Sequence, residues 1–398
     1  MAHIISKKEL LLELYLAEEI ARKHKTKKKY VIEFEKNLHK NLMELCDELY
    51  NHTYKPGRYY CFIIKEPKKR EIFAARYRDR IVHHLYYNLT YRLYERTFIY
   101  DSYSCIKNRG THFGIDRLCG HIRKASKNYT EECHILKMDI KGYFMHIDRN
   151  LLFNVATTSL QNERYKRISK NSQRTWDDVL DFDFITYLTK ELVLFDPTTN
   201  CIFKSKKDEW EDLPYSKSLF HSPQGYGIPI GNLTSQLFSN VFLNLLDQFC
   251  KRSLNCKHYG RYVDDFYVVS ADKNFLHSLI PQIEHFLEYD MHLETNKGKT
   301  KITSYKQGVE FLGTFIKPYR NYISNKTMKR MQNNISDNEK NSWKNGRDIE
   351  MSVNSYLGIF GHNASYNVRK EMFDKAKVLN QIGIFNGNYT KFYRTDSI

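Results

Sequence analysis

Residues 258–270 read HYGRYVDDFYVVS, two apolar runs around a pair of acids. This pattern predicts a β-hairpin with Asp264 and Asp265 at its tip. A third acid, Asp139, interrupts the apolar stretch ILKMDI at 135–140, which is typical of a buried strand that ends at a site. Burying carboxylates costs free energy unless cations or hydrogen bonds compensate, so the acids indicate a metal site. The alternative is a solvated Asp-Asp turn, which is common in hairpins.

Carboxylates on adjacent strand ends suit magnesium chemistry. Mg²⁺ prefers oxygen ligands and is held by a few carboxylates together with substrate phosphates. Two such ions about 4 Å apart lower the pKa of an attacking hydroxyl and neutralise a leaving pyrophosphate. The basic turn HLETNKGKTKI offers Lys297, Lys299 and Lys301 as donors of a proton to the leaving group. Alternatively, these lysines only screen a nucleic-acid backbone.

Composition favours a polyanionic partner. The chain has 398 residues, 41% of them hydrophobic, which suffices for two or three domains with cores. Its 63 Lys and Arg against 46 Asp and Glu give a net charge of +17, which favours nucleic acid over a membrane surface. The aromatic content of 14% suits stacking on unpaired bases or, alternatively, ordinary cores.

The cysteine spacing and the N-terminal residues indicate the cellular compartment of the protein. The eight cysteines form no CxxC pair, so neither a zinc ribbon nor a dense disulfide framework is indicated. Acids at 9, 13, 18 and 19 interrupt the N-terminal apolar residues, and no stretch approaches a membrane-spanning length. We therefore expect a soluble, cytoplasmic protein.

Periodicity predicts the elements around these acids. One amphipathic helix is expected from Phe34 to Leu49, then a strand-like run, a basic turn around Pro67 and a helix. Asn232 is the expected N-cap of a further helix. Residues 154–222 are polar and predict an insertion, a surface element for RNA or partner contact. The stretch VEFLGTFI predicts a strand that ends at Pro318, and a helical pattern begins at Lys326.

The order DIKGYF, PIGNLTSQ, YVDDF, NKGKTKI and FLG resembles the palm motifs of reverse transcriptases. The resemblance implies an α+β, right-hand polymerase with fingers, a palm of antiparallel sheet plus helices, and a helical thumb. It places an N-terminal helical extension at 1–50, fingers at 51–134, a palm at 135–320 with the insertion at about 154–222, and the thumb at 321–398. The implied activity is RNA-directed DNA polymerase, a nucleotidyltransferase.

The resemblance also implies roles for individual residues. Asp139, Asp264 and Asp265 match the metal-binding triad, with the Ile140 carbonyl as a further ligand, for two Mg²⁺ ions or alternatively Mn²⁺. Lys299 matches the lysine proposed as general acid. The implied nucleotide-binding residues are Lys65, Arg70, Tyr143, Phe144, Ile230, Gly231 and Gln236. Residues Phe311, Leu312 and Gly313 match the primer grip, and Arg109 matches a template contact.

Two of these assignments have a physical reason. The Phe144 ring matches the steric gate that excludes a ribose 2′-OH, although an ordinary core phenylalanine is the alternative. The guanidinium of Arg70 suits a bidentate clamp on a triphosphate, and Lys65 lies in the same finger segment.

Two glycine-centred segments compete within SPQGYGIPIGNLTSQ, residues 222–236. The common reverse transcriptase loop is QGxxxSP, followed after three intervening residues by Asn. Counting from Ile230 reproduces that spacing through Gln236 to Asn240, whereas counting from Gln224 does not. The working loop is therefore predicted at Ile230-Gly231, with Ile in place of Gln and Gln in place of Pro.

This IGxxxSQ form resembles the reverse transcriptases of diversity-generating retroelements, which are bacterial or phage-encoded and group II intron-like. That resemblance implies mutagenic retrohoming: a template RNA is copied from a primer with dNTPs into cDNA, with errors at adenines, beside a small basic accessory protein oligomer. Replacing an amide by a branched apolar group removes a polar restraint on base choice. The alternatives are a defence-associated or other bacterial reverse transcriptase, and a catalytically silent RNA-binding scaffold.

Overall fold

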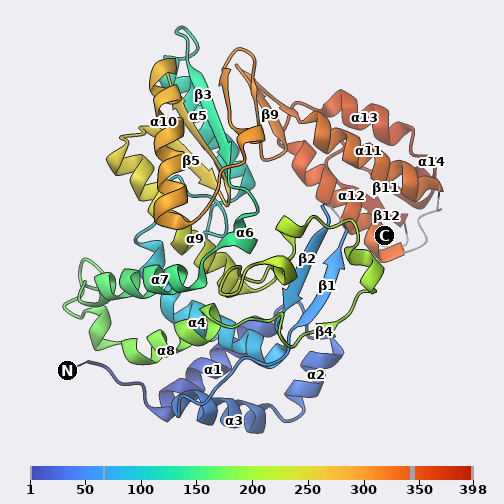
Figure 1. Ribbon diagram of the computed structural model, residues 1–398. Coiled ribbons are helices and arrows are strands. Elements are labelled where there is room, and N and C mark those ends of the chain that lie inside the picture. Colours follow the sequence, from blue (N-terminus) through green and yellow to red (C-terminus); the bar gives the residue numbers. More distant parts are fainter. Residues whose placement is uncertain (1, 66–67, 341–345, 396–398) are drawn as a thin grey trace.

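The structure is a computed structural model that describes residues 2–65, 68–340 and 346–395 (Figure 1). It combines helices with separate small sheets whose strands are mostly antiparallel, so the α+β class is confirmed. The N-terminal helices lie at the bottom of Figure 1, the main sheet at the top and the C-terminal helices at the right. Within the described residues, no helix is both long enough and apolar enough to cross a membrane.

The N-terminal region forms helices α1 (Lys7–Arg22), α2 (Lys29–Glu35) and α3 (Leu38–Tyr50). The single helix expected from Phe34 to Leu49 is wrong, because Asn37 has φ −128° and ψ 40° and separates two helices. Phe34 belongs to α2, where its ring packs edge-on against Tyr77 at 5.3 Å. Helix α1 packs along α4 (Tyr77–Glu95), and both contribute to the largest core.

A small sheet joins the middle of the chain to its N-terminal part. Strands β1 (Tyr60–Ile64) and β2 (Arg70–Ala74) are antiparallel, and β4 (Ile202–Phe203) lies parallel to β1. Pro67, the centre of the expected basic turn, lies outside the described residues. The sequence pattern did not predict β2, which follows that turn directly.

The main sheet has the order β5-β6-β3-β7, with every neighbouring pair antiparallel. Its strands are β3 (His134–Asp139), β5 (His258–Tyr262), β6 (Asp265–Ser270) and β7 (Lys301–Ser304). The predicted hairpin is confirmed, but its tip is Val263-Asp264, where Val263 has φ 53°. The expected place of Asp265 at the tip is wrong, because Asp265 pairs with Tyr262 as the first residue of β6. The predicted strand at 135–140 is confirmed as β3.

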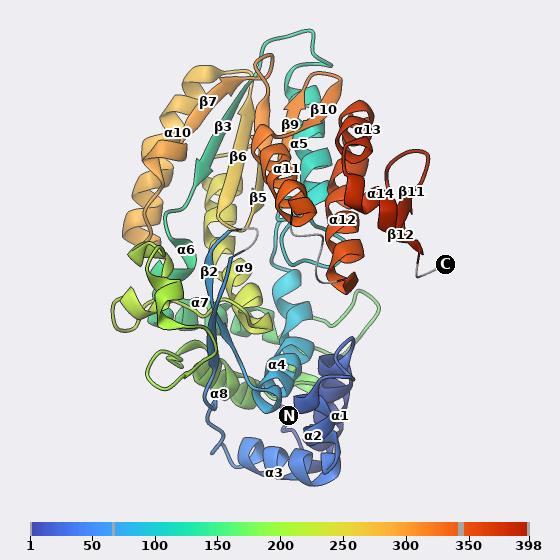
Figure 2. The same ribbon diagram turned by 90° about the vertical axis from the view of Figure 1, so that its right-hand side faces the viewer.

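Alternation along β3 divides the sheet into two packed faces. Leu136 and Met138 belong to the largest core, to which helices α7 (Arg149–Arg164), α9 (Leu233–Gln248) and α10 (Lys273–His285) contribute. Ile135 points to the other face, where α5 (Thr111–Ala125) and the hairpin of β8 (Val309–Phe311) and β9 (Thr314–Lys317) form a second core. Figure 2 shows α10 and α5 on opposite sides of this sheet. Lys137 and Asp139 therefore share the face of the β8–β9 hairpin.

Residues 154–222 are not a separate surface element, so that expectation is wrong for much of the segment. Helix α8 (Phe182–Val193) buries Phe184, Ile185 and Leu188 in the largest core, and Trp176 before it is also buried. Apolar residues at helical spacing within a polar segment explain this packing. Short 3₁₀ turns follow at Lys207–Trp210, Tyr215–Lys217 and Leu219–His221.

The C-terminal region has its own core. It contains helices α11 (Asn325–Lys340), α12 (Gly346–Gly361), α13 (Tyr366–Asp374) and α14 (Lys377–Ile382), with a hairpin of β11 (Gly383–Phe385) and β12 (Phe392–Arg394). The single strand expected before Pro318 is wrong. Leu312 and Gly313 have φ 50° and 83° and reverse the chain between β8 and β9, and β10 (Arg320–Ile323) pairs with β9.

Candidate active site

The three predicted metal ligands lie together at one end of the main sheet. Asp139 ends β3 and is the register partner of Asp265, the first residue of β6. Asp264 occupies the turn just before β6, and its carbonyl accepts the N–H of Ile140 at 3.2 Å. The β3–β6 ladder therefore brings together acids that are 125 residues or more apart in the sequence.

Burial makes negative charge at this end of the sheet unfavourable. It raises the pKa of Asp264, and the neighbouring Asp139 raises it further. Burial also raises the pKa of Asp265 from its ordinary 3.8 to about 6, although Lys137 opposes the shift. Oδ1 of Asp265 is buried and meets no hydrogen-bond partner among the described residues. An unpartnered carboxylate oxygen beside two more carboxylates has the chemistry of a cation site.

Lysines supply the nearby positive charge. Nζ of Lys299 lies 2.7 Å from Oδ2 of Asp139, and Nζ of Lys137 lies 3.0 Å from Oδ2 of Asp265. Within the described ranges, no three His, Cys, Asp or Glu side chains converge on a single metal position. The donor set still fits Mg²⁺, because the carboxylates have free or exchangeable oxygens. A cation bound by Oδ2 of Asp139 would displace the Lys299 ammonium group, whereas Asp265 has Oδ1 free while Lys137 holds Oδ2.

Two lysines at this site were not predicted. Lys137 lies on the same face of β3 as Asp139, and Lys68 lies in the electrostatic field of Asp264. Partial burial lowers the pKa of Lys68, the charges of Lys326 and Lys299 lower it further, and Asp264 opposes this. The basic run KEPKKR at 65–70 signalled a cationic segment, but which of its members approaches the acids depends on the tertiary fold.

The two residues predicted to clamp a triphosphate, Arg70 and Lys65, have different surroundings. Arg70 is exposed at the start of β2, and its charge contributes to the lowered pKa of Lys68. Nζ of Lys65 instead forms an exposed ion pair with Glu209 at 2.9 Å. Of the lysines in this segment, Lys68 interacts with Asp264, whereas Lys65 is paired with Glu209.

Tyr143 and Phe144 begin the short helix α6 (Tyr143–His146), which starts four residues after Asp139. The buried hydroxyl of Tyr143 donates to the Ser239 carbonyl at 2.9 Å and so anchors α6 to α9. Phe144 is half-buried, and its carbonyl accepts the N–H of Ile228 at 2.9 Å. Its ring packs against the same apolar cluster as Ile230 of the candidate loop.

The Ile230-Gly231 segment is bound to the edge of β2. The Ile230 carbonyl accepts the N–H of Phe73 at 2.9 Å. Gly231 has φ 121°, and a Cβ there would lie 2.7 Å from Cγ2 of Ile72. Asn232 is at the N-cap position as predicted, but its side chain bonds β2 instead, with the N–H of Ala75 at 3.0 Å and the carbonyl of Phe73 at 2.8 Å.

The competing segment Pro223-Gln224-Gly225 lies elsewhere. The Gly225 carbonyl accepts the N–H of Arg149, which begins α7, at 3.0 Å. Gly225 has φ 83°, and a Cβ there would meet no described atom within 4 Å. Only the Ile230-Gly231 segment is therefore packed tightly against β2.

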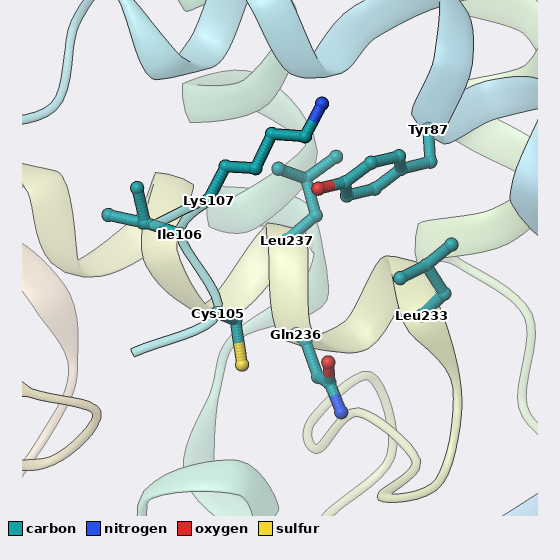
Figure 3. A pocket seen from close by; sticks show the side chains of 7 residues that line it. All are labelled: Tyr87, Cys105, Ile106, Lys107, Leu233, Gln236 and Leu237. Atoms are coloured by element: carbon teal, nitrogen blue, oxygen red, sulfur yellow. The ribbon is translucent and has the colours of Figure 1, made fainter. Parts of the chain in front are cut away.

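Gln236 and Arg109 both lie near the segment of residues 99–107. Gln236 is exposed on α9 and lines a pocket of about 250 Å³ together with Tyr87 and residues 105–107 (Figure 3). Nη1 of Arg109 donates to the carbonyls of Ile99 and Ser102, each at 2.9 Å. The Arg109 guanidinium is therefore partly engaged in holding its own loop.

The predicted primer grip forms the turn of the β8–β9 hairpin. Phe311 is fully buried and meets Tyr267 of β6 edge-on at 5.3 Å. Leu312 and Gly313 turn the chain, and the Leu312 side chain packs against the core to which α5 contributes. The hairpin therefore packs on the same face of the sheet that presents Asp139 and Asp265.

A buried ion pair supports the turn that carries Asp264. The fully buried Arg261 donates to both oxygens of Asp247 at 2.7 and 2.6 Å, and it also donates to the Val263 carbonyl at 3.1 Å. Tyr259 donates its hydroxyl to Asp247 at 2.7 Å. Helix α9 thus fixes the β5–β6 turn through charged hydrogen bonds.

Comparisons with known proteins agree with this geometry. Residues 63–316, more than half of the chain, match the family described as reverse transcriptase (RNA-dependent DNA polymerase). No curated protein sequence matches the chain. Among solved structures, telomerase from Candida albicans in complex with a fragment of telomeric RNA is similar with a TM-score of 0.50 and 12% identity, over 83% of this chain and 56% of that chain.

Apo telomerase from Candida tropicalis is also similar, with a TM-score of 0.48 and 12% identity, over 82% of this chain and 58% of that one. The chain thus spans little more than half the length of these solved structures. At such identity the likeness to the Candida albicans enzyme concerns the fold alone. The family match covers β3, the Ile230-Gly231 segment and the β5–β6 hairpin, and by it the chain belongs to the reverse transcriptase (RNA-dependent DNA polymerase) family.

Proposed function

We propose that this protein is an RNA-directed DNA polymerase that extends a primer along an RNA template. The observation that carries the proposal is the meeting of Asp139, Asp264 and Asp265 at one end of the main sheet, inside the span that matches the family. The resemblance to palm motifs and the net charge of +17 support the same conclusion, because template and primer are polyanions.

The three carboxylates and the Ile140 carbonyl would hold divalent metal, Mg²⁺ or alternatively Mn²⁺. When bound, such ions activate the primer 3′-hydroxyl and neutralise charge on the leaving pyrophosphate. The other steps fall to the chain itself. Lys299, now paired with Asp139, is the proton donor we assign to the leaving group, and Lys68 and Arg70 offer positive charge to the triphosphate.

Neighbouring residues would position the nucleotide and primer. The Phe144 ring would reject a ribose 2′-OH by steric contact, which favours dNTPs. The Ile230-Gly231 segment would contact the nascent base pair; its attachment to β2 and the apolar cluster that it shares with Phe144 support this role. The turn at Phe311, Leu312 and Gly313 would hold the primer end. We assign Gln236 and Arg109 to the template side.

The subtype we propose is that of diversity-generating retroelements, with errors concentrated at template adenines. Ile230 supports it, because an apolar side chain offers no amide hydrogen bond to the base pair. A small basic accessory protein oligomer, a template-repeat RNA and a bacterial or phage setting belong to this proposal. A variable gene with a near-identical template repeat beside the coding gene would support the subtype.

Primer extension on RNA with Mg²⁺ and each dNTP tests both the polymerase activity and the proposed subtype. We expect cDNA synthesis with dNTPs, little with ribonucleotides, and misincorporation mainly opposite adenine. Accurate copying of adenine would contradict the subtype and favour another bacterial reverse transcriptase. RNA binding without any incorporation would favour a catalytically silent scaffold.

A further inference from the structure

Lys137 connects a carboxylate of the candidate active site to the β8–β9 hairpin. Its Nζ lies 3.0 Å from Oδ2 of Asp265 and donates to the carbonyl of Glu310 at 3.0 Å. The same Nζ lies 5.7 Å from the centre of the Phe311 ring. One ammonium group thus contacts both the metal-ligand candidate and the segment that we assign to the primer end.

The sheet explains this placement. Lys137 precedes Asp139 by two residues, so both point to the same face of β3. The partner of Lys137 in β6 is Tyr267, which places Asp265 diagonally across from it on that face. The side chain of Lys137 is 28% exposed and that of Asp265 is 23% exposed, so the ion pair is largely shielded from solvent.

We propose that Lys137 is a positioning residue that couples the orientation of Asp265 to the seating of the β8–β9 hairpin. The inference rests on the proposed polymerase function. Because Lys137 holds Oδ2, the carboxylate cannot rotate freely, and Oδ1 remains the oxygen without a partner among the described residues. Lys137 therefore selects which oxygen is presented to an incoming cation.

The hydrogen bond from Lys137 to the Glu310 carbonyl links Asp265 to the β8–β9 hairpin. The Glu310 carbonyl immediately precedes Phe311, so a shift of the hairpin moves the acceptor of Lys137 as well. Loss of the ammonium group removes the ion pair with Asp265 and the hydrogen bond to Glu310. Both the carboxylate and the hairpin then become more mobile. Groups that orient metal ligands typically change metal affinity or activity by about 10- to 100-fold when removed.

The test compares Lys137→Met, which keeps the apolar stem over Phe311, with Lys137→Arg, which keeps the charge. Lys306→Met is the matched control, since it also removes one lysine from an ion pair, with Glu132 at 2.8 Å. Single-nucleotide incorporation gives kcat, the KM for dNTP and the half-saturating Mg²⁺ concentration. Fluorescence anisotropy in EDTA gives the primer–template affinity without metal, and thermal unfolding reports stability.

For Lys137→Met we expect kcat to fall and the half-saturating Mg²⁺ concentration to rise, each about tenfold. The KM for dNTP should stay within about twofold, because no contact to the nucleotide is removed. Primer–template affinity in EDTA should weaken severalfold. Lys137→Arg should recover most of each loss, and Lys306→Met should match the wild type.

Wild-type kcat, Mg²⁺ requirement and primer affinity in Lys137→Met would overturn the inference. The inference would also be overturned if the loss of activity merely paralleled a lower unfolding temperature and Lys137→Arg recovered none of it. Such a result would mean that Lys137 only stabilises the fold. If the wild-type protein incorporates no nucleotide, the proposed function fails. The anisotropy measurement then decides the coupling, and equal primer–template affinity of wild type and Lys137→Met refutes it.

Discussion

Asp139 and Asp265 are register partners in the β3–β6 ladder, and each is paired with a different lysine. Lys299 contacts the first at 2.7 Å and Lys137 contacts the second at 3.0 Å. Directly opposed like charges destabilise a sheet, and the lysines offset this repulsion without filling every carboxylate oxygen. The two lysines therefore reduce the repulsion between the carboxylates, and Oδ1 of Asp265 is still available to bind a cation.

The first prediction concerns the cost of the Asp265 charge. Asp265→Asn should raise the free energy of unfolding of the metal-free protein at pH 8 by about 1–3 kcal/mol, because the raised pKa of Asp265 means that its ionisation opposes folding. The same variant should lose polymerase activity, because the charge that lowers stability is the one proposed to bind metal. Chemical denaturation in EDTA measures the difference.

The pH dependence of this difference follows from the same shift. Asp265 ionises near pH 6 in the folded protein and near 3.8 in the unfolded chain. The stability that the wild type loses relative to Asp265→Asn is therefore greatest above pH 6. This loss shrinks as the pH falls through 6 and is gone below about pH 4. A stability difference that grows on acidification would contradict this account.

The second prediction concerns the loop on β2. Gly231→Ala should destabilise the protein by about 2 kcal/mol, because the new Cβ would lie 2.7 Å from Ile72 at a φ of 121°. Gly225→Ala is the matched control, with a positive φ but open space, and should cost about 1 kcal/mol. Urea unfolding compares the two, and equal losses would show that the contact with β2 is unimportant.

The third prediction concerns the support of the β5–β6 turn. Asp247→Ala should cost about 3–5 kcal/mol, because it leaves the fully buried Arg261 without its charge partner. The double variant Asp247→Leu with Arg261→Met should be less destabilised than Asp247→Ala, since no charge remains buried. Denaturation curves of both variants test this, and the reverse order would contradict a charge-pairing role.

The fourth prediction concerns base choice. Ile230→Gln should lower misincorporation opposite template adenine severalfold, because it restores an amide beside the nascent pair. Ile230→Val keeps a branched apolar group and should retain the wild-type errors. Sequencing of cDNA made on a defined RNA measures both, and unchanged errors in Ile230→Gln would separate this loop from fidelity.

Much of the active-site end of the sheet is predictable from local pattern. Short apolar runs around acids predict β3 and the β5–β6 hairpin, and the ordered motifs indicate which acids meet. The register of Asp139 with Asp265 follows from the fold, because nothing local sets the pairing of strands 125 residues apart.

Other features depend on tertiary contacts that the sequence pattern hides. The apolar run VEFLGTFI conceals a reversal at Leu312–Gly313, and the polar segment 154–222 conceals the buried helix α8. Strand β2 is too short and too basic at its start for a periodic signal. The role of Lys137 depends on a diagonal contact across the sheet and on the hairpin folding back over it.

Single-nucleotide incorporation by the Asp264→Ala variant tests the central claim most directly. With Mg²⁺, an RNA template and an annealed primer, the wild type should add the templated dNTP. Asp264→Ala should be slower by at least about a thousandfold while binding primer–template normally. Asp290→Ala, which changes an exposed acid, should behave as wild type. Incorporation by Asp264→Ala at the wild-type rate would contradict catalysis by this carboxylate group.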